Sequence, residues 1–181
     1  MADEHRLETD RLTLLALSAE HLRRCLDGPE ALSAGLGLAI CEDLVSEAAR
    51  EAIDVKLQRM ALTPGDEYPW HTYWLMIAKD IRTGIGLVGF KGTPSSQGIA
   101  EVGYGTCAPY RNRGYITEAV RALIAWAFQQ PRCKTIFADT DVQNVASQRV
   151  LTKSGLHRFG RAKDMYLWRL DKAEYEDARS D

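Results

Sequence analysis

Three strand-like segments follow one another in the middle of the chain, joined by short polar turns. They run from Trp70 to Ala78, from Ile85 to Lys91 and from Ile99 to Cys107, and β-branched and aromatic residues are frequent in them. Strands that follow each other through short connections pair in an antiparallel way. The pattern therefore predicts an antiparallel meander.

The clearest helical pattern comes directly after these strands, between Thr117 and Gln129. Apolar residues recur there at helical spacing, at Val120, Leu123, Ile124, Ala127 and Phe128. Pro131 then breaks the helix, and Lys134 to Thr140 has the composition of a strand. A strand, a helix and a strand in succession predict a parallel, right-handed crossover.

The first third of the chain predicts a strand from Arg11 to Leu17 and two helices. Ser18 is a suitable N-cap for a helix from Ala19 to Leu26, and a longer helix is expected from about Asp43 to Leu62. Residues 30–42 are ambiguous. The apolar stripe of the longer helix is most simply a core face, and a wall of an acceptor pocket is the alternative. The stripe comprises Val45, Ala48, Ala49, Ala52, Ile53, Leu57 and Met60.

The last part of the chain predicts a helix that begins at Asn144 and ends near Ser154, followed by two closing strands. These strands run from Phe159 to Arg161 and from Met165 to Leu170, and the charged residues 171–181 are expected to form a frayed tail. Together the elements predict an α/β (α+β) fold with a mixed, mostly antiparallel sheet flanked by helices. We expect one domain over 1–181, with an ordered core over about 7–170.

Composition and charge narrow the classes of function. A chain of 181 residues with 45% hydrophobic content can bury one core, and its net charge of -2 disfavours a protein whose whole surface binds nucleic acid. The start of the chain has no apolar signal core, and no apolar run is long enough to cross a bilayer. We therefore expect a soluble cytoplasmic protein without a nucleic-acid or membrane partner.

The cysteines and histidines give no sign of a metal site. Four cysteines (Cys25, Cys41, Cys107 and Cys133) are widely scattered without a Cys-x-x-Cys pair, and the four histidines lack metal-ligand spacing. We expect the cysteines to be reduced and mostly buried, with Cys107 close enough to a ligand site to line it. No metal is expected.

The best candidate for a ligand-binding site lies where the third strand of the meander meets the following helix, over Tyr110 to Ala119. A helix N-terminus has unpaired N–H groups and about half a positive charge, so it attracts anions. Gly114 allows close backbone approach, and Arg111 and Arg113 add charge. The loop thus favours a phosphate group; a solvated turn is the simpler alternative.

A second glycine-rich stretch matches a dinucleotide-binding pattern in sequence but not in its structural context. The run from Gly84 to Gly89 matches the Gly-x-Gly-x-x-Gly pattern of dinucleotide-binding proteins. That pattern must follow a strand and open a helix, whereas here it leads into a turn at Thr93-Pro94. We interpret these glycines as small residues within a strand.

The phosphate loop resembles the acyl-CoA pyrophosphate loop of the GNAT superfamily of N-acyltransferases, whose pattern is Arg or Gln, two residues, Gly, one residue, then Gly or Ala. Arg111 and Gly114 fit, and Ile116 stands at the last position. The surrounding motifs, in order over about residues 7 to 170, resemble the branch that acetylates ribosomal-protein N-termini. They are Leu7 to Leu12, Ala100 to Tyr104, Thr117 to Ala119, and Asn144, Ser147, Val150, Leu151, Lys153 and Gly155.

This resemblance implies acetyl-CoA as the co-substrate, with its pantetheine arm between two splayed strands. Gly103 and Gly105 suit a bulged or bent strand beside that arm, or alternatively serve packing. The implied cofactor contacts are Thr106, Cys107, Arg111, Asn112, Arg113, Gly114, Tyr115, Ile116, Thr117 and Asn144. For Asn144 the alternative is a plain helix N-cap.

Transfer of an acetyl group to an amine needs a base for the amine and an acid for the departing thiolate. Glu101 matches the position of a catalytic glutamate in several family members, and Ser147 matches a serine proposed to protonate the thiolate. The alternatives are an exposed or ion-paired strand carboxylate for Glu101 and a small helix-packing hydroxyl for Ser147.

The expected function is N-acetyl transfer from acetyl-CoA to a primary amine in a ternary complex. The acceptor stays open among peptide N-termini, aminoglycosides, polyamines and small metabolites, and so does the oligomeric state, a homodimer included. A non-catalytic CoA-binding or regulatory module of the same fold is the alternative. An RNA-binding protein is disfavoured, because Arg111, Arg113 and Arg121 form no basic stripe.

Overall fold

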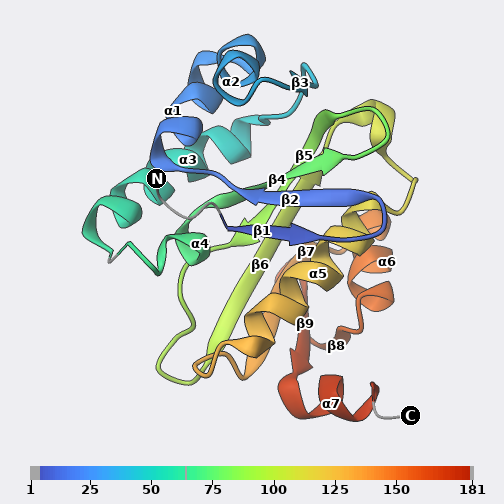
Figure 1. Cartoon of the computed structure of the whole chain (residues 1–181). Helices are drawn as coiled ribbons and strands as arrows, with labels where there is room; N and C mark the ends of the chain where they lie inside the picture. Colours follow the sequence, from blue (N-terminus) through green and yellow to red (C-terminus); the bar gives the residue numbers. More distant parts are fainter. Residues whose placement is uncertain (1–4, 64, 180–181) are drawn as a thin grey trace.

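The computed structural model describes residues 5–63 and 65–179. Within them the chain forms a mixed, nine-stranded sheet in the order β1-β2-β4-β5-β6-β7-β9-β8, with β3 beside β5 (Figure 1). The strands are β1 (Arg6–Glu8), β2 (Leu12–Ala16), β3 (Ala39–Ile40), β4 (Tyr73–Ala78), β5 (Thr83–Phe90), β6 (Ile99–Thr106), β7 (Thr135–Asp141), β8 (His157–Ala162) and β9 (Met165–Asp171).

Helices cover the sheet on both faces. They are α1 (Ala19–Asp27), α2 (Pro29–Leu36), α3 (Glu47–Leu62), α4 (Tyr68–His71), α5 (Tyr115–Gln129), α6 (Val145–Lys153) and α7 (Lys172–Asp177), and a 3-10 turn covers Ala108–Tyr110. In Figure 1, α5 lies across the sheet, whereas α1, α2 and α3 gather at the opposite end of the molecule from α7.

Alternation along the strands produces two apolar cores. Leu14 of β2 and Val88 of β5 belong to the core under α5, whereas Leu15 and Leu87, their neighbours in sequence, belong to the core under α1 and α3. Successive strand residues point to opposite faces, so each strand supplies both layers. The aromatic side chains of Trp70, Trp74, Phe90 and Trp126 pack together in the α5 core.

The predicted meander is confirmed, and so is the parallel pairing of the two strands that the crossover connects. β4, β5 and β6 pair antiparallel in sequence, and α5 connects β6 to the parallel strand β7. β6 and β7 pair only where Ile99–Glu101 lies beside Thr135–Phe137, and their later residues have no pairing with each other. The sheet therefore splits between these two strands, next to the N-terminus of α5.

Some boundaries differ from the sequence prediction. The long helix starts at Glu47 rather than near residue 43, because Ser46 provides the cap by accepting a hydrogen bond from the N–H of Ala49. The ambiguous residues 30–42 contain α2 and β3, and Trp70 lies in the short helix α4.

The prediction of a frayed tail is wrong for residues 172–177. They form α7, whose capping box joins Asp171 and Glu174, so local side-chain bonds offset the high charge of this segment. Residues 1–4 and 180–181, at the ends of the expected single domain, lie outside the described residues.

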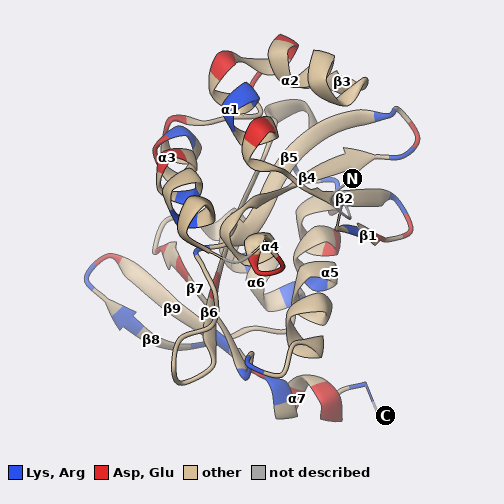
Figure 2. Ribbon diagram, turned by 60° about the vertical axis from the view of Figure 1, so that its left-hand side comes forward, with Lys and Arg blue, Asp and Glu red and all other residues tan. Residues whose placement is uncertain are grey.

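The surface charge is mixed. Segments of Lys and Arg alternate with segments of Asp and Glu on α1, α3 and α7 (Figure 2). None of the helices in the described part of the chain has both the length and the apolar character needed to cross a membrane.

Candidate active site

A cleft of about 1290 Å³ opens along the unpaired part of β6. Its walls come from α3, the C-terminal end of β5, the loop before α5 and one side of α6. All of these elements are fixed by the sheet or by the two cores, so the split between β6 and β7 is a built opening rather than a gap between loops.

The floor of this cleft is made by two glycines of β6. A Cβ placed on Gly103 or Gly105 would meet no atom within 4 Å, and both residues line the cleft. The pairing of β6 with β5 runs without a register shift from Gly86↔Thr106 to Phe90↔Val102, so the prediction of a bulge here is wrong. The glycines keep the floor flat and open.

Backbone groups of β6 face the opening. The N–H of Lys91 bonds to the carbonyl of Glu101 and the N–H of Cys107 to that of Ile85, which assigns the odd-numbered residues of β6 to β5. By alternation, the N–H and C=O groups of Tyr104 and Thr106 face the split. A ligand with amide groups can pair with this edge as a strand would.

The loop before α5 ends the cleft with a cluster of free N–H groups. Asn112 and Gly114 have φ of 60° and 80°, and the described residues offer no acceptor to the backbone N–H groups of 112–117. Successive free N–H groups at a helix start form a concave site for an anion. This geometry fits the predicted phosphate-binding function of the loop.

Gly114 is needed for its backbone conformation. A Cβ there would lie 3.3 Å from Nη2 of Arg11, and the left-handed φ would strain any other residue. The Arg11 guanidinium also donates to the carbonyl of Arg113 at 3.0 Å. The loop is therefore held from the side opposite the cleft.

Glu118 completes this support. Its carboxylate accepts from the Thr9 hydroxyl at 2.6 Å, from the Arg11 N–H at 2.8 Å and from the Arg11 Nε at 2.7 Å. Burial raises the pKa of Glu118, but the hydrogen bonds from Thr9 and Arg11 outweigh burial and hold the pKa below its ordinary value. The N-terminal Leu7-to-Leu12 segment thus positions the loop.

Most of the expected cofactor contacts meet at the cleft. Eight line it: Thr106, Arg111, Asn112, Gly114, Tyr115, Ile116, Thr117 and Asn144. Arg113 and Cys107 do not; Arg113 lies over the Tyr110 ring at 5.8 Å from its centroid, and the Cys107 side chain is buried in the core under α1 and α3. Ile116 both lines the cleft and packs against the α5 core.

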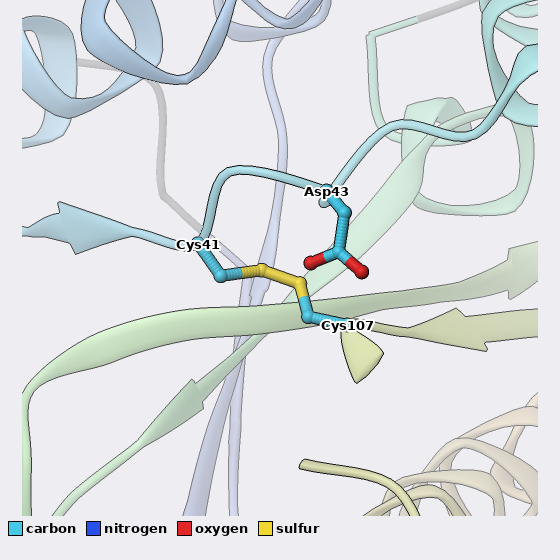
Figure 3. Close-up of side chains that lie close together, drawn as sticks. All are labelled: Cys41, Asp43 and Cys107. Atoms are coloured by element: carbon cyan, nitrogen blue, oxygen red, sulfur yellow. A yellow bond between two sulfur atoms is a disulfide. The ribbon is translucent and has the colours of Figure 1, made fainter. Parts of the chain in front are cut away.

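Cys107 forms a disulfide with Cys41, 66 positions earlier (Figure 3). The expectation of reduced cysteines is therefore wrong for this pair; Cys25 and Cys133 are free and buried, and burial raises their pKa values to about 12 and 11. The bond joins the loop before α3 to the end of β6.

Asp43 lies beside this disulfide. Ligand atoms of Cys41, Asp43 and Cys107 lie within 4.8 Å of one another, as a metal site would require. The disulfide leaves neither sulfur as a thiolate, and the Asp43 carboxylate accepts from the N–H of Ala108 at 2.9 Å. In this state the group closes the loop rather than offering ligands.

Glu101 lies next to the cleft rather than on its wall. It lines an adjoining hollow of about 460 Å³ together with His71, Arg59 and Lys91, and its carboxylate pairs with the Lys91 ammonium. Arg59 and Lys91 line both spaces, so the hollow continues the cleft. The ion pair foreseen as the alternative is present.

Asn144 and Ser147 lie together at the start of α6. The Asn144 side chain accepts from the Ser147 N–H at 3.1 Å, so the N-cap alternative is confirmed, and both residues also line the cleft. The Tyr104 hydroxyl of β6 donates to the Ser147 carbonyl at 3.2 Å. Burial raises the pKa of Tyr104 to about 12, so it stays protonated while it bridges the split.

Three further residues at the cleft were not among the predicted site residues: Lys56, Arg59 and Tyr104. Lys56 is 7% exposed, lines the cleft and donates to the carbonyls of Thr72 at 3.2 Å and Phe90 at 2.6 Å. The signal was available for Lys56: it stands four positions after Ala52, on the apolar stripe of α3, where a lysine needs an internal partner.

Comparisons with known proteins agree with this geometry. The family of the acetyltransferase (GNAT) domain matches residues 11–157. An uncharacterized N-acetyltransferase of Bacillus subtilis (strain 168), YjdG, is 35% identical over 82 residues, which are 45% of this chain and 49% of the relative. The chain thus matches about half of the length of that relative.

Solved structures share the fold. A ribosomal-protein-S5-alanine acetyltransferase from Vibrio fischeri superposes with a TM-score of 0.69 at 18% identity, covering 95% of this chain and 99% of the other. RimL, a ribosomal L7/L12 α-N-protein acetyltransferase in complex with coenzyme A, gives 0.67 at 14% identity, covering 92% and 98%.

Proposed function

Because the chain belongs to the acetyltransferase (GNAT) family, we propose that it moves an acetyl group from acetyl-CoA to a primary amine. The acceptor is a protein N-terminus or a small-molecule amine, and both substrates bind before direct transfer. The motifs of the ribosomal-protein N-terminal branch favour the first acceptor. The observation that carries the proposal is the open cleft along β6, which ends at the free N–H groups of 112–117.

The cleft can hold acetyl-CoA with its pyrophosphate at the loop before α5 and its thioester near the start of α6. The pyrophosphate accepts hydrogen bonds from the N–H groups of 112–117, with Arg111 beside it. The pantetheine amides pair with the edge of β6 at Tyr104 and Thr106, above the open floor at Gly103 and Gly105. The thioester then lies near the start of α6.

In the reaction the neutral amine attacks the thioester carbonyl carbon, a C–N bond forms and the C–S bond breaks. An α-amine has a pKa of about 8, so most of it is protonated at neutral pH. The ammonium form must lose a proton before it can attack. We assign this proton to Glu101, directly or through water, and the proton for the departing thiolate to Ser147. Tyr104 is a positioning residue, since its hydroxyl holds the Ser147 carbonyl.

A non-catalytic CoA-binding module is the competing function. It shares the cleft but not the chemistry, so binding of acetyl-CoA without thiol release across many amines would favour it. An acceptor screen monitored by mass spectrometry separates the two.

The proton carriers are tested with that acceptor. Glu101→Gln should bind acetyl-CoA normally and lose about a hundredfold in kcat/KM at neutral pH, with recovery as the pH rises through the pKa of the acceptor amine. Ser147→Ala should lower kcat without this recovery, because high pH supplies no proton to the thiolate. Full activity of both variants at neutral pH would contradict these roles.

A further inference from the structure

Basic side chains gather where the cleft meets the hollow, at the start of β6. Arg59 and Lys91 line both spaces, and Lys56 lines the cleft beside them. The Arg59 guanidinium donates to the backbone carbonyl of Lys91, and Lys56 donates to the carbonyls of Thr72 and Phe90. Arg59 and Lys91 therefore place positive charge where the cleft joins the hollow, and Lys56 adds to it when it is protonated.

Only one of these cations has an anionic partner. Lys91 pairs with Glu101, whereas the described residues provide no carboxylate within ion-pair distance of Lys56 or Arg59. The remaining acidic residue on the two linings is Asp43, which is bound to the N–H of Ala108. This end of the site has positive charge that the protein itself does not balance.

The neighbouring titratable groups respond to this charge. Burial and then the Arg59 charge lower the pKa of Lys56 to about 7. The pKa of His71 is lowered by burial, Arg59 and Lys56 in that order, with only Glu67 opposing. The Nδ1 atom of His71 is buried without a partner among the described residues, and His71, 8% exposed, lines the hollow. His71 and Lys56 thus lie within the electrostatic influence of Arg59.

The phosphates of the donor do not meet this need. Residues 101 to 106 of β6 separate the hollow from the phosphate loop, and at a rise of about 3.3 Å per residue they span about 16 Å. Interactions between exposed charges at that distance are largely screened at physiological salt. Arg59 is exposed, and among the residues that line the two spaces no carboxylate pairs with it, so its guanidinium is free to bind an anionic group of the acceptor.

We propose that the acceptor is an amine that also carries a carboxylate group, which Arg59 binds where the hollow joins the cleft. This inference rests on the proposed acetyl transfer and defines its substrate class. The chemistry is that of a free amino acid or of an acidic peptide N-terminus. Polyamines and aminoglycosides, whose additional charges are positive, are repelled by the same side chains.

The test compares ligands that differ in the carboxylate alone, by calorimetry on protein saturated with coenzyme A. Phenylalanine against phenethylamine examines the free amino acid, the C-terminal amide of Ala-Glu-Ala against that of Ala-Gln-Ala examines the peptide, and spermidine represents the polycations. In at least one pair, we expect the ligand with the carboxylate to bind at least about tenfold more tightly than its partner. Arg59→Gln should remove this preference.

Arg50→Gln is the matched control. Arg50 lies on the same helix and donates to the carbonyl of Leu26, away from the cleft, so its loss should leave the preference unchanged. Equal affinities within both pairs, tighter binding of spermidine, or a preference that survives Arg59→Gln would overturn the proposal. Failure to bind coenzyme A would instead contradict the proposed function, and the first titration reveals it separately.

Discussion

The neighbouring strands β5 and β6 both contain closely spaced glycines, and they use them in opposite ways. In β5, a Cβ on Gly84, Gly86 or Gly89 would lie 2.7, 2.6 or 2.7 Å from the nearest atom. In β6, a Cβ on Gly103 or Gly105 would meet nothing within 4 Å. Glycine spacing is similar in the two strands, yet one set permits close packing and the other keeps a binding surface open.

The largest expected difference between the strands is in stability. Gly86→Val places carbon against the Gly105 carbonyl oxygen at 2.6 Å and the Thr106 Cα at 3.1 Å, and these backbone atoms cannot move without breaking the β5–β6 ladder. We expect a loss of about 3 kcal/mol in the free energy of unfolding, measured by denaturant titration. Gly103→Val should change it by about 0.5 kcal/mol or less. Similar losses for both variants would break the comparison.

The pKa of Lys56 reports how well the packing against β5 excludes water, because its ammonium group donates to the carbonyl of Phe90 at the end of that strand. Its pKa falls from 10.5 to about 7 in the folded protein, so between these values the unfolded chain binds a proton that the folded chain lacks. The free energy of unfolding therefore rises with pH between about 7 and 10.5. The contribution of Lys56 to it is fully present above pH 10.5 and is lost as the pH falls to about 7.

The measurement compares wild type with Lys56→Met by denaturant titration at several pH values. The wild type should gain on the order of 2 kcal/mol relative to the variant between pH 7 and pH 9. Parallel pH profiles would mean that Lys56 is not closed off from water.

The two arginines of the phosphate loop sharpen the comparison at the end of β6. Arg111 lines the cleft and Arg113 does not, so Arg111→Ala should weaken acetyl-CoA binding about tenfold and Arg113→Ala about threefold or less. The Arg111 effect should shrink at high salt. Equal losses, measured by calorimetry, would show that the charge of the loop acts without regard to position.

Local patterns predicted much of the fold. The apolar spacing of α5, the cap of α1 by Ser18 and the three strands of the meander all follow from neighbouring residues. What the sequence could not supply depends on distant partners. The Cys41–Cys107 bond spans 66 positions, and the two-strand split depends on where β6 and β7 stop pairing.

The site was partly predictable for the same reason. The phosphate loop is a local motif, and most of the residues predicted there line the cleft, whereas Lys56 and Arg59 lie on a helix whose approach to β5 only the tertiary structure reveals. Glu101 was predicted as a candidate base from its position in the strand, and the partner of its carboxylate, Lys91 across the ladder, was not specified. The two glycine sets were separable only because a turn follows β5 and a helix follows β6.

The most direct test of the open floor is a calorimetric titration of acetyl-CoA into wild type and Gly105→Leu. The leucine side chain would extend into the cleft without meeting protein atoms near its Cβ, so the variant should melt at nearly the wild-type temperature. We expect one site in the wild type and at least about tenfold weaker binding in Gly105→Leu. Unchanged affinity in a folded variant would contradict the assignment of this cleft to the donor.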